Sequence, residues 1–144
     1  MKISTKGRYA LRMLIDLTQH AGEGFVSLKD IAERQDISQK YLEQIVTHMT
    51  RAGFLKGMRG SQGGYRLTRD PGDIRVGEIL EAIEGSLAPV ACLEPGKDSC
   101  DRCGDCSTLE LWKGLYDNVM NYLNSITLQD MVNRAKVSGG IINV

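Results

Sequence analysis

Apolar residues recur every three or four positions in six segments of the chain, which is the spacing of one helix face. We therefore expect helices at about residues 5–19, 28–34, 39–52, 76–84, 108–124 and 128–135. Serine and threonine side chains at the start of such segments cap free backbone N–H groups. The expected N-caps are Thr5, Ser27, Ser38 and Thr127.

The second and third helices are short and separated by a polar turn at residues 35–37, which fits a helix-turn-helix. An ordinary helical hairpin fits these two segments equally well. The next residues favour the helix-turn-helix, because strands at 54–58 and 65–67 flank a glycine-rich basic tip at 59–64. The tip lacks the strand-to-helix context of a nucleotide phosphate loop. The predicted fold is mainly α with a small β-hairpin wing: a winged helix-turn-helix plus a long dimerisation helix.

In a winged helix the helix after Ser38 enters the major groove of DNA, and the wing reaches the phosphate backbone or the minor groove. Expected phosphate contacts are Lys6, Arg8, Arg51 and Lys56. Expected contacts at the start of the recognition helix, mainly to base edges, are Ser38, Gln39, Lys40, Tyr41, Glu43 and Gln44. Tyr41 packing inward is the alternative for that residue. In the wing we expect Arg59, Gly60, Ser61 and Gly63 to meet the duplex, with Gly60, Gly63 and Gly64 taking positive φ angles.

The fifth predicted helix carries a wide apolar stripe, formed by Leu109, Trp112, Tyr116, Val119, Met120 and Leu123. A stripe of this width is expected to meet a second copy of the chain in a coiled-coil-like contact, giving a homodimer. A single long core helix is the alternative.

All four cysteines, Cys92, Cys100, Cys103 and Cys106, lie in one polar, glycine-rich segment. Free cysteine normally behaves as a small buried hydrophobe, so this cluster is expected to serve sulfur chemistry. Four thiolates suit an iron–sulfur cluster or tetrahedral zinc, and close Cys-x-x-Cys pairs also occur in disulfide switches. The residues alone leave these three readings open. His20 and His48 are expected at the surface or at helix ends and not as metal ligands.

The chain of 144 residues has no net charge, but residues 1–70 carry twelve Lys or Arg against seven Asp or Glu. A basic front half favours a polyanionic partner. No apolar run is long enough for a membrane span or a signal peptide, so a cytoplasmic protein with no membrane partner is expected. No constellation typical of an enzyme is found. We expect a DNA-binding domain at 1–84, a cysteine loop at 85–107, the dimerisation helix and a short docking helix at 108–135, and a tail at 136–144.

Four motifs resemble the Rrf-type winged-helix transcription regulators: Ser4-Thr-Lys-Gly-Arg-Tyr9, Tyr41-Leu-Glu-Gln44, Arg59-Gly-Ser-Gln-Gly-Gly-Tyr65 and Ile126-Thr-Leu-Gln-Asp130. The resemblance covers about residues 1–135 and is greatest to the iron–sulfur cluster regulators of that family. It implies a homodimer that binds a double-stranded DNA operator, and a repressor that senses cluster, redox or nitric oxide status and controls cluster biogenesis genes. The alternative is a zinc-binding or thiol-redox regulator of sulfur or cysteine metabolism, although the cysteine-metabolism members lack such a cysteine loop.

The resemblance also implies that Cys92, Cys100 and Cys106 hold the cluster, with [2Fe–2S] favoured over [4Fe–4S]. Two features depart from the family pattern. The gap from Cys92 to Cys100 is longer, and Leu109 stands where the cluster regulators have a ligating histidine. Leucine cannot bind iron, so Cys103 is the first candidate for the fourth ligand, ahead of Glu110 or a residue of the dimer partner.

Overall fold

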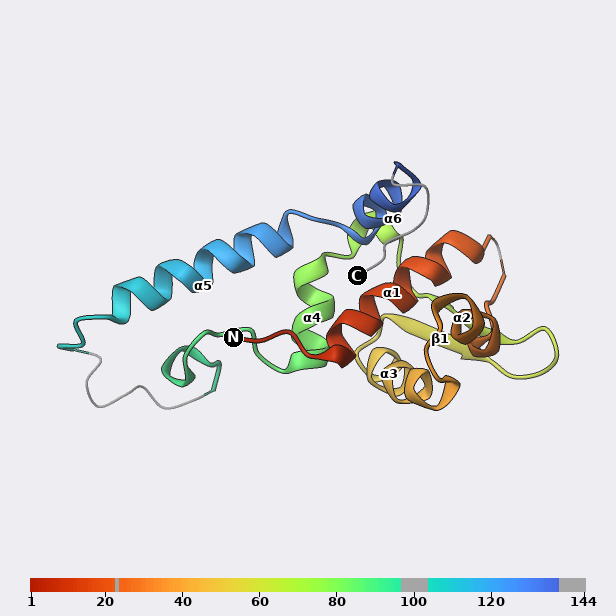
Figure 1. The fold of residues 1–144 in the computed structure, drawn as a ribbon, viewed down its shortest axis with the longest axis horizontal. Coiled ribbons are helices and arrows are strands. Elements are labelled where there is room, and N and C mark those ends of the chain that lie inside the picture. The colour runs from red at the N-terminus through yellow and green to blue at the C-terminus, as the bar shows by residue number, and fades with distance from the viewer. Residues whose placement is uncertain (23, 97–103, 138–144) are drawn as a thin grey trace.

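The computed structural model describes residues 1–22, 24–96 and 104–137. Their elements, in chain order, are α1 (Thr5–His20), α2 (Leu28–Gln35), α3 (Gln39–Arg51), β1 (Leu55–Met58), β2 (Gly64–Leu67), η1 (Pro71–Asp73), α4 (Val76–Glu84), η2 (Ala91–Leu93), α5 (Leu109–Asn124) and α6 (Leu128–Val137). In Figure 1, α1 to α4 and the hairpin form one body, and α5 extends away from it. The mainly helical fold with a small β-hairpin wing is thus confirmed.

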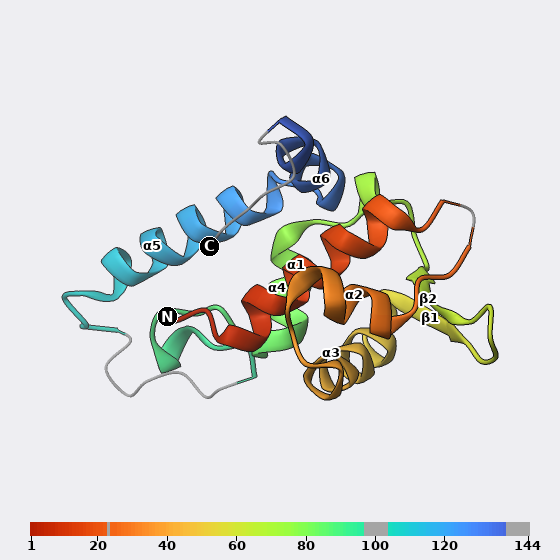
Figure 2. The same ribbon diagram turned by 45° about the vertical axis from the view of Figure 1, so that its right-hand side comes forward.

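The hydrophobic core lies where α1, α2, α3, α4 and α6 meet, and Figure 2 shows α1 running through the middle of this body. Met13, Leu14 and Leu17 of α1 are fully buried, as are Leu42 and Ile45 of α3. Each of these helices therefore buries one apolar stripe and leaves its polar face in water, as an amphipathic pattern predicts.

Side-chain caps fix where the helices begin. The hydroxyl oxygens of Ser27 and Ser38 accept hydrogen bonds from the backbone N–H groups of Asp30 and Tyr41, at 3.2 and 3.1 Å. The expected cap at Thr5 was wrong: Ser4 has the extended backbone of an N-cap, and its oxygen accepts from the Gly7 N–H at 3.1 Å. Thr5 is already the first helical residue.

The cap at Thr127 is confirmed and is reciprocal. Asp130 donates its backbone N–H to the Thr127 hydroxyl at 3.0 Å, and its carboxylate accepts the Thr127 N–H at 2.9 Å. This capping box starts α6, which extends to Val137, two residues beyond the expected end.

The wing is an antiparallel pair in which Leu55 opposes Leu67 and Met58 opposes Gly64. Val26 joins it as an isolated bridge to Tyr65, with backbone bonds of 2.9 and 2.8 Å. Gly64 has φ +146°, and a Cβ there would collide with the Val26 carbonyl. Gly60 also has positive φ, at +108°, as expected. Gly63 does not; glycine is needed there because a Cβ would meet the Met58 carbonyl.

A buried ion pair holds α1 against α2. The Asp16 side chain is 1 % exposed and accepts from the Arg34 guanidinium at 2.7, 3.0 and 3.2 Å. The Gln35 amide donates to the same carboxylate at 2.9 Å. Because α2 and α3 form the helix-turn-helix, this contact fixes that pair on α1.

α5 packs against the body near its C-terminal end, where Met120 and Leu123 contact a small cluster of Val76, Leu80, Leu87 and Ile126. Its six stripe residues are all half-buried, and no residue of α5 is fully buried. Leu111 and Tyr122, on a neighbouring strip of the helix, are 62 % and 61 % exposed. Among the described residues, no helix is long and apolar enough to cross a membrane.

Candidate nucleic-acid interface and metal centre

α3 presents its polar side to solvent. Leu42, Ile45, Val46 and Met49 are buried, which fixes the rotation of the helix about its axis. The opposite side exposes five of the residues predicted to contact DNA: Ser38, Gln39, Lys40, Glu43 and Gln44. Ser38 is also occupied as the N-cap of α3.

Tyr41 differs from its predicted neighbours, because its ring packs inward. It is half-buried and meets the Tyr9 ring edge-to-face with 5.6 Å between centroids. The Arg12 guanidinium lies 5.2 Å from the centroid of Tyr9 on α1. The structure thus favours the inward alternative for the Tyr41 ring.

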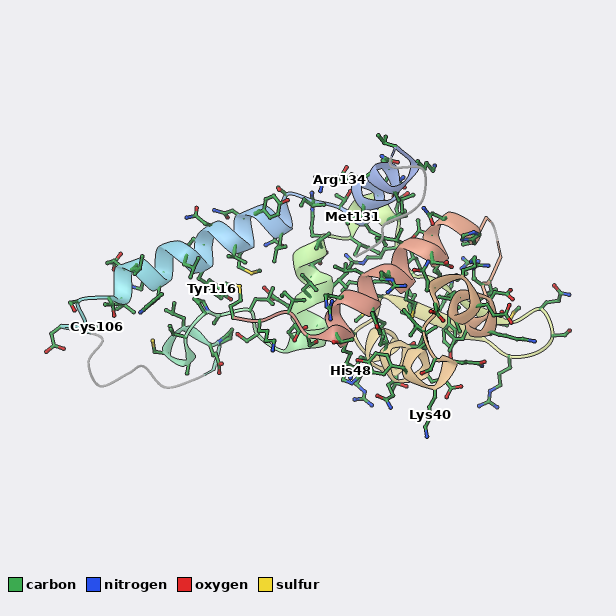
Figure 3. The ribbon with its side chains drawn as sticks, in the orientation of Figure 1. Lys40, His48, Cys106, Tyr116, Met131 and Arg134 are labelled. Carbon is green, nitrogen blue, oxygen red and sulfur yellow. The ribbon has the colours of Figure 1, made fainter. Side chains whose placement is uncertain are left out.

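The basic residues predicted to contact phosphates come from three elements, α1, α3 and β1. Arg8, Arg51 and Lys56 are exposed. Lys6 is half-buried, and its Nζ lies 2.8 Å from Nε2 of His48, a contact that the sequence did not predict. Figure 3 labels His48 and Lys40 along the same edge of the body, which α3 forms.

A groove separates α3 from the wing. It is lined by Val46, Thr47, Thr50, Arg51, Gly57, Met58, Arg59 and Tyr65. The groove places Arg51 of α3 and Arg59 of the wing on one concave surface. Gly60 and Ser61 are exposed at the wing tip, and Gly63 is half-buried. Two guanidinium groups that flank a groove between a helix and a wing can hold a polyanionic backbone.

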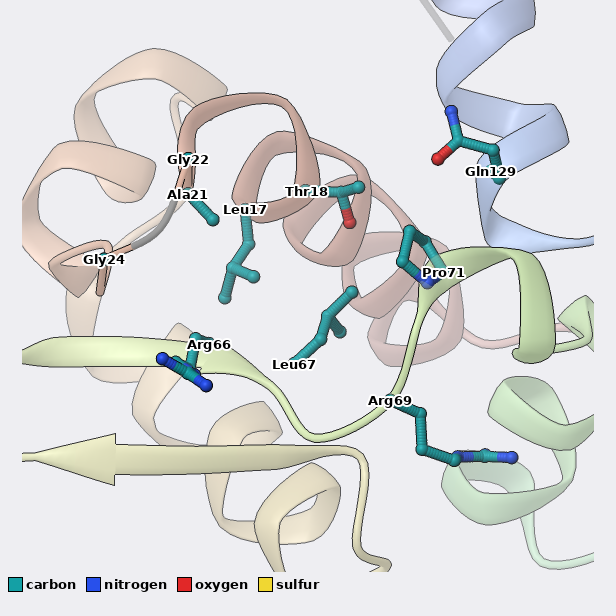
Figure 4. Close-up of a pocket in the computed structure, with 10 residues that line it drawn as sticks. All are labelled: Leu17, Thr18, Ala21, Gly22, Gly24, Arg66, Leu67, Arg69, Pro71 and Gln129. Atoms are coloured by element: carbon teal, nitrogen blue, oxygen red, sulfur yellow. The ribbon is translucent and has the colours of Figure 1, made fainter.

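A second hollow lies behind the wing, between the end of α1, β2 and α6 (Figure 4), and Arg66, Arg69 and Gln129 are among its lining residues. Both guanidinium groups are already engaged. Arg66 stacks over Phe25 and Arg69 over Phe54, each at 5.4 Å, and Arg69 also pairs with Glu78 at 3.6 Å. We assign this hollow no role.

Two of the four cysteines lie in the described part of the chain. Cys92, on η2, is half-buried, Cys106, just before α5, is exposed, and both thiols are free. Figures 1 and 2 place η2 and the start of α5 at the end of the molecule away from the wing. Cys100 and Cys103 lie outside the described residues. Within the described ranges, no group of three or more potential metal ligands comes together.

The environment of Cys106 favours its thiolate. Its Sγ lies 3.5 Å from the Thr108 hydroxyl. That hydrogen bond, helped by the backbone N–H groups of Thr108 and Leu109, lowers the pKa of the Cys106 thiol below its usual value. A deprotonated sulfur is the form that binds metals, so this residue suits the predicted role.

Sequence reasoning missed several side-chain contacts, among them Asp16 with Arg34, Lys6 with His48, and Ser4 with Glu84. In the last, the Glu84 carboxylate accepts from the Ser4 backbone N–H and hydroxyl at 3.0 and 2.7 Å. Only Asp16 carried a signal, because it is a charge between the apolar residues Ile15 and Leu17. A charged residue is almost never fully buried without a partner.

The fold, the exposed face of α3 and the glycine-rich wing define the winged helix-turn-helix class of transcription regulators. The chain belongs to the Rrf2 family, described as "Iron-dependent Transcriptional regulator", whose sequence profile matches residues 3–134. It is 39 % identical to the HTH-type transcriptional regulator IscR of Pectobacterium atrosepticum over 137 residues, which is 95 % of this chain and 82 % of that protein. The family is not enzymatic.

Two solved structures are similar throughout. The IscR of T. potens is 44 % identical, with a TM-score of 0.74 over 94 % of this chain and 88 % of that one. CymR of B. subtilis, described as the global cysteine regulator, is 41 % identical, with a TM-score of 0.76 over 93 % and 98 %. The predicted family is confirmed. The chain is similar to both IscR and CymR, so the family alone does not choose between their functions.

Proposed function

We propose that this chain is a DNA-binding transcriptional repressor whose operator affinity depends on a cysteine-ligated iron–sulfur cluster, and that it regulates genes for cluster assembly. The observation that carries the proposal is the cysteine segment, which joins the winged-helix body to α5. All four cysteines of the chain fall there, and the two described ones are free thiols. The relationship to IscR proteins and the iron-dependent description of the family support it.

The donor set fits an iron–sulfur cluster. Cys106 has a lowered pKa and is exposed, and Cys92 is half-buried on η2. These two, with Cys100 and Cys103, would hold the group, and [2Fe–2S] is the favoured type. Thiolates are the usual ligands of such clusters. A bound cluster would supply redox and nitric oxide chemistry, and the chain itself would supply the thiolates.

DNA binding is assigned to the exposed side of α3 and to the wing. Gln39, Lys40, Glu43 and Gln44 are free to reach base edges from the N-terminal half of the recognition helix. Arg51 and Arg59 would contact the phosphate backbone of the DNA from the two sides of the groove between α3 and the wing. Each phosphate contact that is lost should reduce the steepness with which affinity falls as salt rises.

The operator-binding form is a homodimer in this proposal. α5 buries none of its residues fully on its own chain and exposes Leu111, Leu115 and Tyr122. An apolar helix face of this kind is stabilised when a second copy covers it. Two α5 helices side by side would set the spacing of the two α3 helices, and hence the half-site spacing.

Anaerobic purification tests the proposal directly. We expect a brown protein with visible absorbance and iron and sulfide in stoichiometric amounts. Alanine substitution of Cys92, Cys100 and Cys106 together should abolish the colour and change operator affinity or target choice. Unchanged operator binding and target choice in the reconstituted triple variant would refute the coupling.

A second candidate is a zinc-binding or thiol-redox regulator of cysteine metabolism. It is favoured by the similarity to B. subtilis CymR, the global cysteine regulator, over nearly the whole chain. Four clustered cysteines suit zinc as well as iron. Colourless anaerobic protein with tightly held zinc would support this candidate and exclude the cluster sensor.

A further inference from the structure

The imidazole of His48 and the ammonium of Lys6 meet on the face assigned to DNA. Lys6 lies in the first turn of α1 and His48 in the last turn of α3, with 2.8 Å between Nζ and Nε2. A protonated lysine has no acceptor, so Lys6 donates and Nε2 accepts. The contact therefore requires a neutral imidazole whose proton is on Nδ1. Both side chains are half-buried, so solvent or a ligand can still reach them.

The charged groups on the elements around His48 leave this pair without a carboxylate partner. α3 packs against α1, α2, α4 and β1. On α2, Arg34 is bound to Asp16, and on α4, Glu84 is bound to Ser4. Arg51, one turn beyond His48, and Lys56 of β1 are exposed cations. In the described part of the chain, no acidic side chain forms a hydrogen bond or ion pair with His48 or Lys6.

We propose that Lys6 and His48 form a seat for one DNA phosphate, and that filling this seat is coupled to protonation of His48. The proposal rests on the proposed DNA-binding function. A phosphate oxygen is an acceptor, so it can receive hydrogen bonds from Lys6 and from a protonated imidazole together. The imidazole takes its proton from solvent, exchanging the Lys6 contact for one with the phosphate. The C-terminal end of α3 also favours a cation at this position.

The proposed coupling fixes the direction in which DNA affinity changes with pH. The DNA-bound form binds more protons than the free form, so affinity must fall as pH rises through the titration range of histidine. A phosphate that favours the charged imidazole tenfold would raise affinity by up to about tenfold per subunit between about pH 8 and pH 6. Phosphate contacts do not depend on base sequence, so a random-sequence duplex reports the effect.

The test is the affinity of the full-length protein for a short random-sequence duplex, measured by fluorescence anisotropy at constant ionic strength across that pH range. His48→Gln keeps an acceptor for Lys6 but cannot be protonated, and it should flatten the pH dependence. His20→Gln is the matched control, because His20 is the chain's other histidine and is held at the far end of α1 by Asp16. The His20→Gln variant should keep the wild-type dependence of affinity on pH. The terminal amine and the thiols are present in every variant, so they cannot cause a difference between variants.

Calorimetry in two buffers of different ionisation enthalpy should show proton uptake on DNA binding by the wild type and less by His48→Gln. His48→Asn is a second variant should the first unfold. Wild-type binding whose pH dependence survives in both variants would overturn the phosphate seat while leaving the proposed function intact. No binding to the random duplex or to genomic DNA at any pH would overturn both.

Discussion

The ion pair between Asp16 and Arg34 predicts a large loss of stability when Arg34 is replaced by alanine. Three hydrogen bonds join the guanidinium to a carboxylate that is 1 % exposed. Removing one partner of a buried pair costs about 3–5 kcal/mol, because the other charge is left without compensation. Arg34 itself is 34 % exposed, and Gln35 would still donate to Asp16, so the lower end of this range applies.

We therefore expect Arg34→Ala to lower the free energy of unfolding by about 3 kcal/mol, which corresponds to a drop in Tm of about 10 °C for a domain of this size. Asp16→Ala should cost less, about 2 kcal/mol, because the freed Arg34 can turn into water. The double variant should be little worse than Arg34→Ala. This double-mutant cycle thus predicts a coupling energy of about 2 kcal/mol between Asp16 and Arg34.

The measurements are urea and thermal unfolding followed by far-UV circular dichroism, all at one protein concentration. Lys29→Ala is the matched control, because it removes one positive charge from an exposed position of the same helix. The hydrogen bond to Asp16 raises the pKa of Arg34. A raised pKa stabilises the fold at every pH below the usual value, so this contribution should be constant between about pH 6 and pH 9. A loss for Arg34→Ala no larger than for Lys29→Ala would refute the buried-pair reasoning.

Three further predictions follow from single contacts. Gly64→Ala should destabilise the protein by about 2 kcal/mol or more, because φ is +146° and the new Cβ meets the Val26 carbonyl. Gly114→Ala, with open space around it, should be neutral or stabilising in the same unfolding experiments. Equal effects of the two substitutions would contradict the steric role given to Gly64. The pKa of Asp130 is lowered by hydrogen bonds from the Thr127 backbone and side chain, so its contribution is present above about pH 4 and lost as pH falls. Asp130→Asn should therefore lower Tm at neutral pH but not in strong acid, unlike Asp117→Asn on exposed α5. Cys106 in reduced, metal-free protein should be alkylated at a lower pH than an ordinary thiol, as measured by peptide-resolved mass spectrometry. Thr108→Val, but not Ser107→Ala, should raise the midpoint pH of this alkylation. An unchanged midpoint in Thr108→Val would exclude the Thr108 hydroxyl as the cause.

The helices of the body were predictable because each buries an apolar stripe of its own sequence and begins at a local cap. Ser38 and Thr127 show this, since their hydroxyls bond to backbone only three residues away. The cap at Thr5 was misassigned because Ser4 and Thr5 are both cap-forming residues, and Ser4 is also fixed from outside by Glu84, eighty positions away in the sequence. A contact of that range leaves no local pattern.

Among the predicted DNA-binding residues, too, local features could be predicted and long-range contacts could not. The exposed polar side of α3 could be predicted from its helical period, whereas the Tyr41 ring was not settled because its partner, Tyr9, lies on another helix. Lys6 and His48 are likewise brought together only by the packing of α1 on α3. The six-residue stripe of α5 is half-buried, with Leu111 and Tyr122 exposed beside it, and its contact with a second copy of the chain stays a prediction.

The proposed coupling between the cysteine segment and DNA has a physical route through α4. Cys106 immediately precedes α5, and the far end of α5 is fixed to α4: a Cβ on Gly77 would collide with the Asn124 amide oxygen, and the Val76 N–H donates to the Ile126 carbonyl at 2.9 Å. α4 in turn packs on both α1 and α3. In the proposed coupling, α5 therefore links Cys106, which lies just before its first turn, to α4, which packs on the recognition helix. In the proposed function, a change at the cysteines that turns α5 would move α4 or reorient the proposed dimer partner on the exposed side of α5, and either movement would displace α3 relative to a DNA half-site.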